Sequence, residues 1–185
     1  AIEQAIHVQP GDAQYRLYQA QVLMSLGRYE DADRVVKDTL ATANPPKYLQ
    51  ARALCLQGDI ALVGASRDVK QALKLHMQSI ELADTASTDT KTTVRREAKR
   101  VLVDAHLGAA HAIALGQWNK KEAVVPKWLI KAGEAATDLV NNEGAETYLR
   151  FHVAHRALVA IAASQGAVDG SRVTQDFQSL GAREL

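Results

Sequence analysis

Two histidines, His152 and His155, are the residues whose spacing most directly suggests chemistry. They lie three residues apart on an expected helix, so both imidazoles face one side, and imidazole is a common zinc ligand. A zinc site needs a third and a fourth ligand, and no nearby acidic residue completes a spacing such as His-Glu-x-x-His. His106 and His111 lie about 140° apart around a helix and face different sides. We therefore expect no metal site.

The sequence contains no arrangement typical of an enzyme. It has no Gly-x-Ser-x-Gly nucleophile motif and no glycine-rich loop that would hold a phosphate at the start of a helix. Cys55 is the only cysteine and stands in an apolar run, so we interpret it as a packed thiol. We therefore expect no enzyme, with no catalytic residue and no cofactor, although a catalytic triad assembled from distant residues stays open at this level.

The clearest charge feature is a basic cluster at the start of an expected long helix. Lys91, Arg95 and Lys99 follow each other at four-residue steps and form one stripe, and Arg96 and Arg100 form the neighbouring stripe. Such a stripe is often a solvated face of the protein. It is also suited to bind an acidic peptide or phosphate groups. Both interpretations stay open from the sequence alone.

The whole chain is nearly neutral, which disfavours one class of partner. Its 22 basic and 21 acidic residues give a net charge of +1, whereas a general nucleic-acid binder carries a clear basic excess. No run of about 18 apolar residues occurs, so we expect no membrane insertion. The compartment is not fixed by the sequence. The absence of a disulfide framework favours a cytoplasmic location.

Apolar residues at helical spacing organise the first part of the chain. Between residues 12 and 40 they form two amphipathic runs. Gly27 separates the runs, and glycine is favoured at the left-handed position that ends a helix. Neither helix buries its stripe alone, so we expect an antiparallel pair. The stripe residues are Leu17, Ala20, Leu23, Met24 and Leu26 in the first helix and Tyr29, Ala32, Val35, Val36 and Leu40 in the second.

This helix pair resembles the tetratricopeptide repeat. The matching residues are Ala20, Leu26, Gly27, Tyr29, Ala32 and Leu40, followed by Asn44 and Pro45. Ala5 and Thr39 also stand one repeat length of this family apart, so residues 1–9 are expected to end a preceding repeat. The resemblance is clearest over residues 1–45 and diverges after about residue 84. Because the chain starts in the middle of an expected helix, we interpret it as a fragment of a longer protein.

The later part of the chain is also expected to form helix pairs, but it matches the repeat motif less closely. A helix is expected from about Lys47 to Val63, with Pro46 in its first turn. The polar stretch 85–93 is expected to be a linker or a helix start, followed by a long helix that ends near Leu115. Residues 101–115 are apolar almost all round, so we place them at the centre of the domain.

We therefore predict an all-α fold without a sheet, in one domain spanning residues 1–185. The resemblance implies that its helix pairs stack as a right-handed superhelix, an α-solenoid, of about eight or nine helices. The expected pairs span residues of about 12–42, 46–84, 90–139 and 144–180.

The resemblance also implies a non-catalytic scaffold that binds a protein or peptide on its concave face, which the first helices of the pairs line. The candidate partner-binding residues are Tyr15, Arg16, Gln19, Arg52, Gln57, Arg95, Arg96 and Arg100. Two alternatives remain: a self-assembling module, in which the apolar ends of the array stack between copies, and a helical domain that binds a ligand or a metal near His152 and His155.

Overall fold

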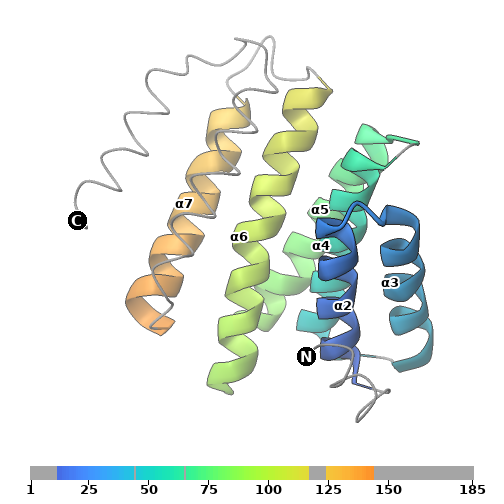
Figure 1. The fold of residues 1–185 in the computed structure, drawn as a ribbon. Helices are drawn as coiled ribbons and strands as arrows, with labels where there is room; N and C mark the ends of the chain where they lie inside the picture. Colours follow the sequence, from blue (N-terminus) through green and yellow to red (C-terminus); the bar gives the residue numbers. More distant parts are fainter. Residues whose placement is uncertain (1–11, 44, 65, 117–123, 144–185) are drawn as a thin grey trace.

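A computed structural model describes residues 12–43, 45–64, 66–116 and 124–143. Over these ranges the chain forms six α-helices and no strand, which confirms the predicted all-helical class (Figure 1). The expected preceding repeat at residues 1–9 and the expected fourth pair at 144–180 lie outside the described residues. The helices are α2 (Ala13–Ser25), α3 (Tyr29–Ala43), α4 (Lys47–Val63), α5 (Val69–Ala86), α6 (Thr92–Leu115) and α7 (Val124–Glu143).

The helices pack in the order in which they follow along the chain. α2 lies against α3, α4 against α5, and α6 against α7. Successive pairs meet mainly between the second helix of one pair and the first helix of the next, α3 with α4 and α5 with α6. The first helices are also in contact, since α4 packs on both α2 and α6 (Figure 1). This arrangement brings α2, α4 and α6 side by side.

The helix ends follow from local side-chain chemistry. The Asp12 carboxylate accepts a hydrogen bond from the backbone N–H of Gln14 at 2.8 Å and so caps the start of α2. Gly27 has a φ of 73°, the left-handed conformation expected there. The Asp68 carboxylate caps α5 by accepting from the N–H of Gln71 at 2.9 Å. These residues mark where α2 begins and ends and where α5 begins.

Two expected boundaries need correction. Pro46 stands just before α4, with an extended ψ of 154°, rather than in the first turn of the helix. Thr85 belongs to α5 rather than to a linker, since the helix continues to Ala86. The Thr85 hydroxyl donates to the carbonyl oxygen of Glu81 at 3.0 Å, so this polar residue is accommodated inside a helix.

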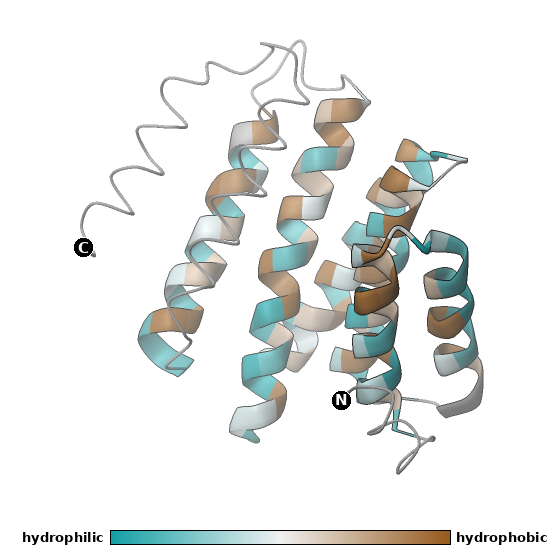
Figure 2. Ribbon diagram, viewed as in Figure 1, coloured by the Kyte–Doolittle hydropathy of each residue, from teal (hydrophilic) through white to brown (hydrophobic). Residues whose placement is uncertain are grey.

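The long helix α6 lies at the centre of the described part, as predicted. It contacts α4, α5 and α7, and small residues in its second half allow that close packing. Figure 2 shows hydrophilic residues in the first turns of α6 and more hydrophobic ones further along. The buried residues of α6 are Ala98, Val101, Val103, Ala105, Leu107, Gly108, Ala109, Ala110, Ala112, Ile113 and Ala114.

The core also includes one face of α7 and the single cysteine. Leu129, Ala132 and Leu139 of α7 are buried. Cys55 is packed, with 4% of its surface exposed. None of the described helices is both long enough and apolar enough to cross a membrane.

Candidate functional site

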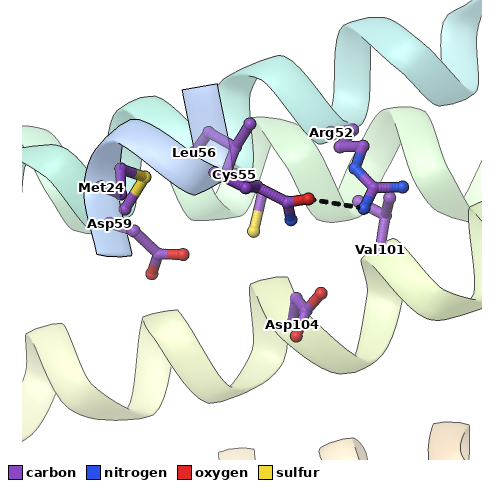
Figure 3. A pocket seen from close by; sticks show the side chains of 8 residues that line it. Met24, Arg52, Cys55, Leu56, Asp59, Val101 and Asp104 are labelled. Carbon is purple, nitrogen blue, oxygen red and sulfur yellow. Dashed lines mark hydrogen bonds between the residues drawn. The ribbon is translucent and has the colours of Figure 1, made fainter. Parts of the chain in front are cut away.

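The first helices of the three described pairs enclose a small pocket. Its volume is about 140 Å³, and it lies where α2, α4 and α6 meet (Figure 3). We call it the first-helix pocket. Its lining residues are Gln21 and Met24 from α2, Arg52, Cys55, Leu56 and Asp59 from α4, and Val101 and Asp104 from α6.

Arg52, on α4, forms hydrogen bonds to α2 and α6 at one end of this pocket. Its Nη2 donates to Oε1 of Gln21 on α2 at 3.0 Å, and its Nη1 donates to Oε2 of Glu97 on α6 at 3.1 Å. Its guanidinium also lies over the ring of Tyr18, 4.6 Å from the centroid, in a cation–π contact. The Arg52 side chain is only 16% exposed, so these bonds form largely out of water. The charge of Arg52 is therefore matched within the chain.

Two carboxylates mark the other end of the first-helix pocket. Asp59 comes from α4 and Asp104 from α6, and Figure 3 shows both in the space between these two helices. Behind Asp59, Nε2 of His76 lies 3.7 Å from Oδ1. His76 is fully buried, so this contact reaches from the core of the protein to the wall of the pocket. The lining of the pocket thus includes one guanidinium that is bound within the chain and two carboxylates.

Of the residues that the sequence predicted for partner binding, Arg52 is the one that lines the first-helix pocket. Tyr15, Arg16 and Gln19 are half-buried on α2, but that helix lines the pocket through Gln21 and Met24 instead. Gln57 is half-buried on α4. Gln57 lies five residues after Arg52, so it points about 140° away around the helix. Arg52 and Gln57 therefore lie on different sides of α4.

The predicted basic cluster on α6 meets carboxylates of α7. Nε of Arg95 donates to Oε1 of Glu143 at 2.6 Å, and Nζ of Lys99 donates to the same oxygen at 3.0 Å. Lys99 also pairs with Asp138 at 2.7 Å. Hydrogen bonds from Arg95 and then Lys99 lower the pKa of Glu143 to about 2. These two cations of the cluster hold α6 to α7.

In the second stripe of the basic cluster, Arg100 is also paired within the chain. Nη1 of Arg100 donates to Oε1 of Glu97 at 2.9 Å, which joins Arg100 to the Arg52 network. Nε of Arg96 is buried without a hydrogen-bond partner among the described residues. Lys91 is exposed at the start of α6. The cluster is therefore mostly an internal ion-pair network rather than an open cationic surface.

A second recess lies between the start of α4, the end of α5 and the start of α6. Its volume is about 650 Å³. Several of its lining side chains are exposed, so the recess has few walls that would take a ligand out of water. These exposed residues are Pro46, Lys47, Thr85, Lys91 and Thr93. We therefore regard the first-helix pocket as the better candidate site.

Sequence reasoning missed Asp59 and Asp104. A signal for Asp59 was present, because Asp59 lies seven residues after Arg52 and thus two helical turns along the same face. Asp104 carried no such signal, since only the packing of α6 on α4 brings it to the pocket. Among the described residues, no group of three or more His, Cys, Asp or Glu side chains is placed to hold a metal ion. His152 and His155 lie outside the described residues.

No protein-family model, curated protein or solved structure matches this chain. The chemistry of the first-helix pocket is therefore the basis on which a function is assigned.

Proposed function

We propose that this chain is a non-catalytic scaffold of tetratricopeptide-like helix pairs that binds an extended peptide or a partner helix along α2, α4 and α6. The observation that carries the proposal is the first-helix pocket, which lies where the first helices of three successive pairs meet. In a solenoid of helix pairs, the first helices line the concave face. A peptide lying across them would place one side chain in the pocket.

The packing order of the helices supports a repeat architecture. Each described pair contacts the pair next to it: α2 and α3 pack on α4, and α4 and α5 pack on α6. Contacts restricted to neighbouring repeats are what a solenoid requires. The two small residues Ala20 and Ala32, which carry the resemblance in the first pair, are both fully buried and allow that pair to approach closely.

A peptide selection tests the proposed function. A phage library of random dodecapeptides would be panned against the intact chain, and enriched sequences would be made as synthetic fluorescent peptides. We expect peptides that bind the wild-type chain and lose affinity when Met24→Trp fills the first-helix pocket. Met24 is half-buried at the pocket wall, so the larger ring is accommodated there. Circular dichroism would verify that the variant keeps its helices.

Two outcomes would count against the scaffold. A selection that yields no binding peptide would refute a peptide-binding role. Peptides that bind wild type and Met24→Trp equally would show that the binding surface lies elsewhere.

Self-association is a second candidate, favoured by one apolar strip. Val22 near the end of α2 and Leu26, the residue that follows this helix, are 42% and 66% exposed. Exposed apolar residues that lie side by side are suited to contact a second copy. Analytical ultracentrifugation over a hundredfold concentration range would detect such a dimer. Leu26→Lys should then return it to a monomer, and a monomer at every concentration would exclude this candidate.

A further inference from the structure

The imidazole ring of His76 lies between the backbones of α4 and α6. A β-carbon added at Gly58 on α4 would come within 2.8 Å of Cε1 of the ring, and one added at Gly108 on α6 would overlap the ring. His76 itself belongs to α5 and is fully buried. The two helices therefore approach each other across the ring, with a glycine on either side of it.

Both glycines stand inside helices, where glycine is unfavourable. Glycine loses more conformational freedom on folding than any other residue, so alanine is the small residue that a helix interior favours. Gly58 is the single glycine of α4, and Gly108 is the single glycine of α6. Both of them meet the same ring. In a close-packed interior, this arrangement indicates that the ring sets the distance between the two backbones.

The ring acts at the level of the first-helix pocket. Asp59 follows Gly58 directly on α4 and lines the pocket. Asp104 lines it from α6 and lies one helical turn before Gly108, on the same face of that helix. Nε2 of His76 lies 3.7 Å from Oδ1 of Asp59. The separation of α4 and α6 at the ring thus also determines the width of the pocket between these helices.

We infer that His76 is a positioning residue for partner binding: its ring holds α4 and α6 at the separation that the first-helix pocket requires. His76 is buried behind the residues that line the pocket, so it acts through the two helices and not by contact with the partner. The binding part of this inference rests on the proposed scaffold function. The spacing itself is measurable on the chain alone.

The thiol of Cys55 reports this spacing without a ligand. Cys55 is the only cysteine of the chain, lines the first-helix pocket and is 4% exposed. Figure 3 shows its sulfur on the side of α4 that faces α6. The rate at which it reacts with methyl methanethiosulfonate therefore depends on the separation of these helices. The thiolate takes up the methylthio group as a mixed disulfide and methanesulfinate leaves, so mass spectrometry gives the rate.

A variant that replaces the ring with methyl groups tests the spacing. In His76→Ala/Gly58→Ala/Gly108→Ala the methyl groups fill part of the space that the ring leaves, and both helices gain helix propensity. α4 and α6 should then lie closer together, and Cys55 should react at least about threefold more slowly than in wild type. A fold that is merely less stable would open more often and react faster. A rate equal to or above that of wild type would overturn the inference.

The fold of this triple variant would be verified by circular dichroism and urea unfolding. If the triple variant does not fold, the single change His76→Ala gives the same comparison, with slower labelling again as the expected result.

Peptide affinity tests the consequence for binding. The probe is a dodecapeptide selected on the wild-type chain and blocked by Met24→Trp. It should bind the triple variant at least about tenfold more weakly. His76→Phe keeps a planar ring between the two glycines and should recover most of that affinity. Fluorescence anisotropy would measure each dissociation constant.

Leu129→Ala is the matched control for a loss of stability. Leu129 is fully buried on α7, which does not line the pocket. This change leaves a cavity in the core and lowers stability, but it should not change the affinity of the folded chain for the peptide. An equal loss of affinity in Leu129→Ala and in the triple variant would assign the effect to stability and overturn the positioning role.

The outcomes separate this inference from the proposed scaffold. Slower labelling of Cys55 with an unchanged peptide affinity would overturn the positioning role and leave the scaffold standing. Peptides that bind wild type and Met24→Trp equally would count against the scaffold, while the labelling rate would still decide whether His76 sets the separation of α4 and α6.

Discussion

The imidazole of His76 fills the space beside Gly108 that a β-carbon would otherwise occupy. A Cβ built on Gly108 would overlap the imidazole ring, and one built on Gly58 would lie 2.8 Å from its Cε1. His76 is on α5, while Gly58 and Gly108 are on α4 and α6. The ring of a fully buried histidine thus sits against two helix backbones, at points where only glycine leaves room.

Replacing Gly108 with alanine should therefore destabilise the protein. In an exposed helix the change from glycine to alanine stabilises by about 0.5–1 kcal/mol. At Gly108 the added methyl group overlaps the imidazole, and overpacking of this kind costs about 1–3 kcal/mol. Urea unfolding followed by circular dichroism would measure the difference.

A second variant identifies the side chain with which the added methyl group at position 108 overlaps. His76→Ala opens space beside Gly108, so the combined variant His76→Ala/Gly108→Ala should be more stable than the sum of the single effects predicts, by about 1 kcal/mol. Strict additivity of the two effects would mean that the methyl group clashes with something else.

Removing Arg52 should loosen the packing of α4 against its neighbours. Arg52→Ala deletes hydrogen bonds to Gln21 and Glu97, and hydrogen bonds to charged groups contribute about 2 kcal/mol. Arg52→Lys should recover only part of that loss, because an ammonium lacks the planar fork that reaches both partners. Thermal melting would rank the variants. As a control, Lys37→Ala breaks a pair in which Lys37 is 65% exposed, and it should cost less than about 1 kcal/mol.

The ion pairs of Glu143 with Arg95 and Lys99 of α6 predict that the stability of the protein depends on pH. Pairing with Arg95 and Lys99 lowers the pKa of Glu143 from 4.5 to about 2. A folded-state pKa below the unfolded-state value means that the stabilisation is complete above 4.5 and is lost as the pH falls toward 2. Glu143→Gln should therefore melt at a lower temperature than wild type at pH 7 and at the same temperature near pH 2.

Glu134→Gln is the matched control for this comparison, because Glu134 is exposed on the same helix. Its melting temperature should follow wild type at every pH. A constant gap between Glu143→Gln and wild type from pH 7 to pH 2 would argue against the ion pairs as its cause.

His106 predicts a second dependence of stability on pH, in a higher pH range than that of Glu143. Burial, with a contribution from nearby Lys131, lowers the pKa of His106 from 6.5 to about 4. The fold therefore favours the neutral imidazole, whose ring meets Trp128 edge-on with centroids 5.5 Å apart. Stability is fully present above 6.5 and declines as the pH falls toward 4.

His106→Phe should remove this decline while keeping an aromatic ring against Trp128. Melting temperatures at pH 7.5 and pH 5 would show it: the wild type should lose more stability between these values than the variant. An equal loss in both proteins would assign the pH dependence to other groups.

Much of the local structure was predictable because it depends on neighbouring residues. Helix periodicity and cap residues gave the bounds of α4, Lys47–Val63, and the end of α6 at Leu115, both as observed. The boundary at Thr85 was missed, since polar composition suggested a linker where a threonine hydroxyl in fact bonds the helix backbone.

The candidate site was predictable only in part. Arg52 was expected to face a partner, and it does line the first-helix pocket, but its guanidinium is bound to Gln21 and Glu97. Arg95 was expected on a binding surface and instead pairs with Glu143, 48 residues further along the chain. Composition shows that acidic and basic residues are nearly equal in number, but it does not show which of them form ion pairs.

The sequence by itself determined that this chain is helical, where its described helices begin and end to within a few residues, and that the second half of α6 is buried. These features follow from contacts within about four residues, which spacing in the sequence encodes directly. Only the tertiary structure decided that Asp59 and Asp104 share a pocket, that Arg52 joins three helices and that His76 lies against Gly108. These contacts depend on the distance between packed helices and on the rotation of each helix about its axis. Many side chains that are far apart in the sequence jointly determine both quantities.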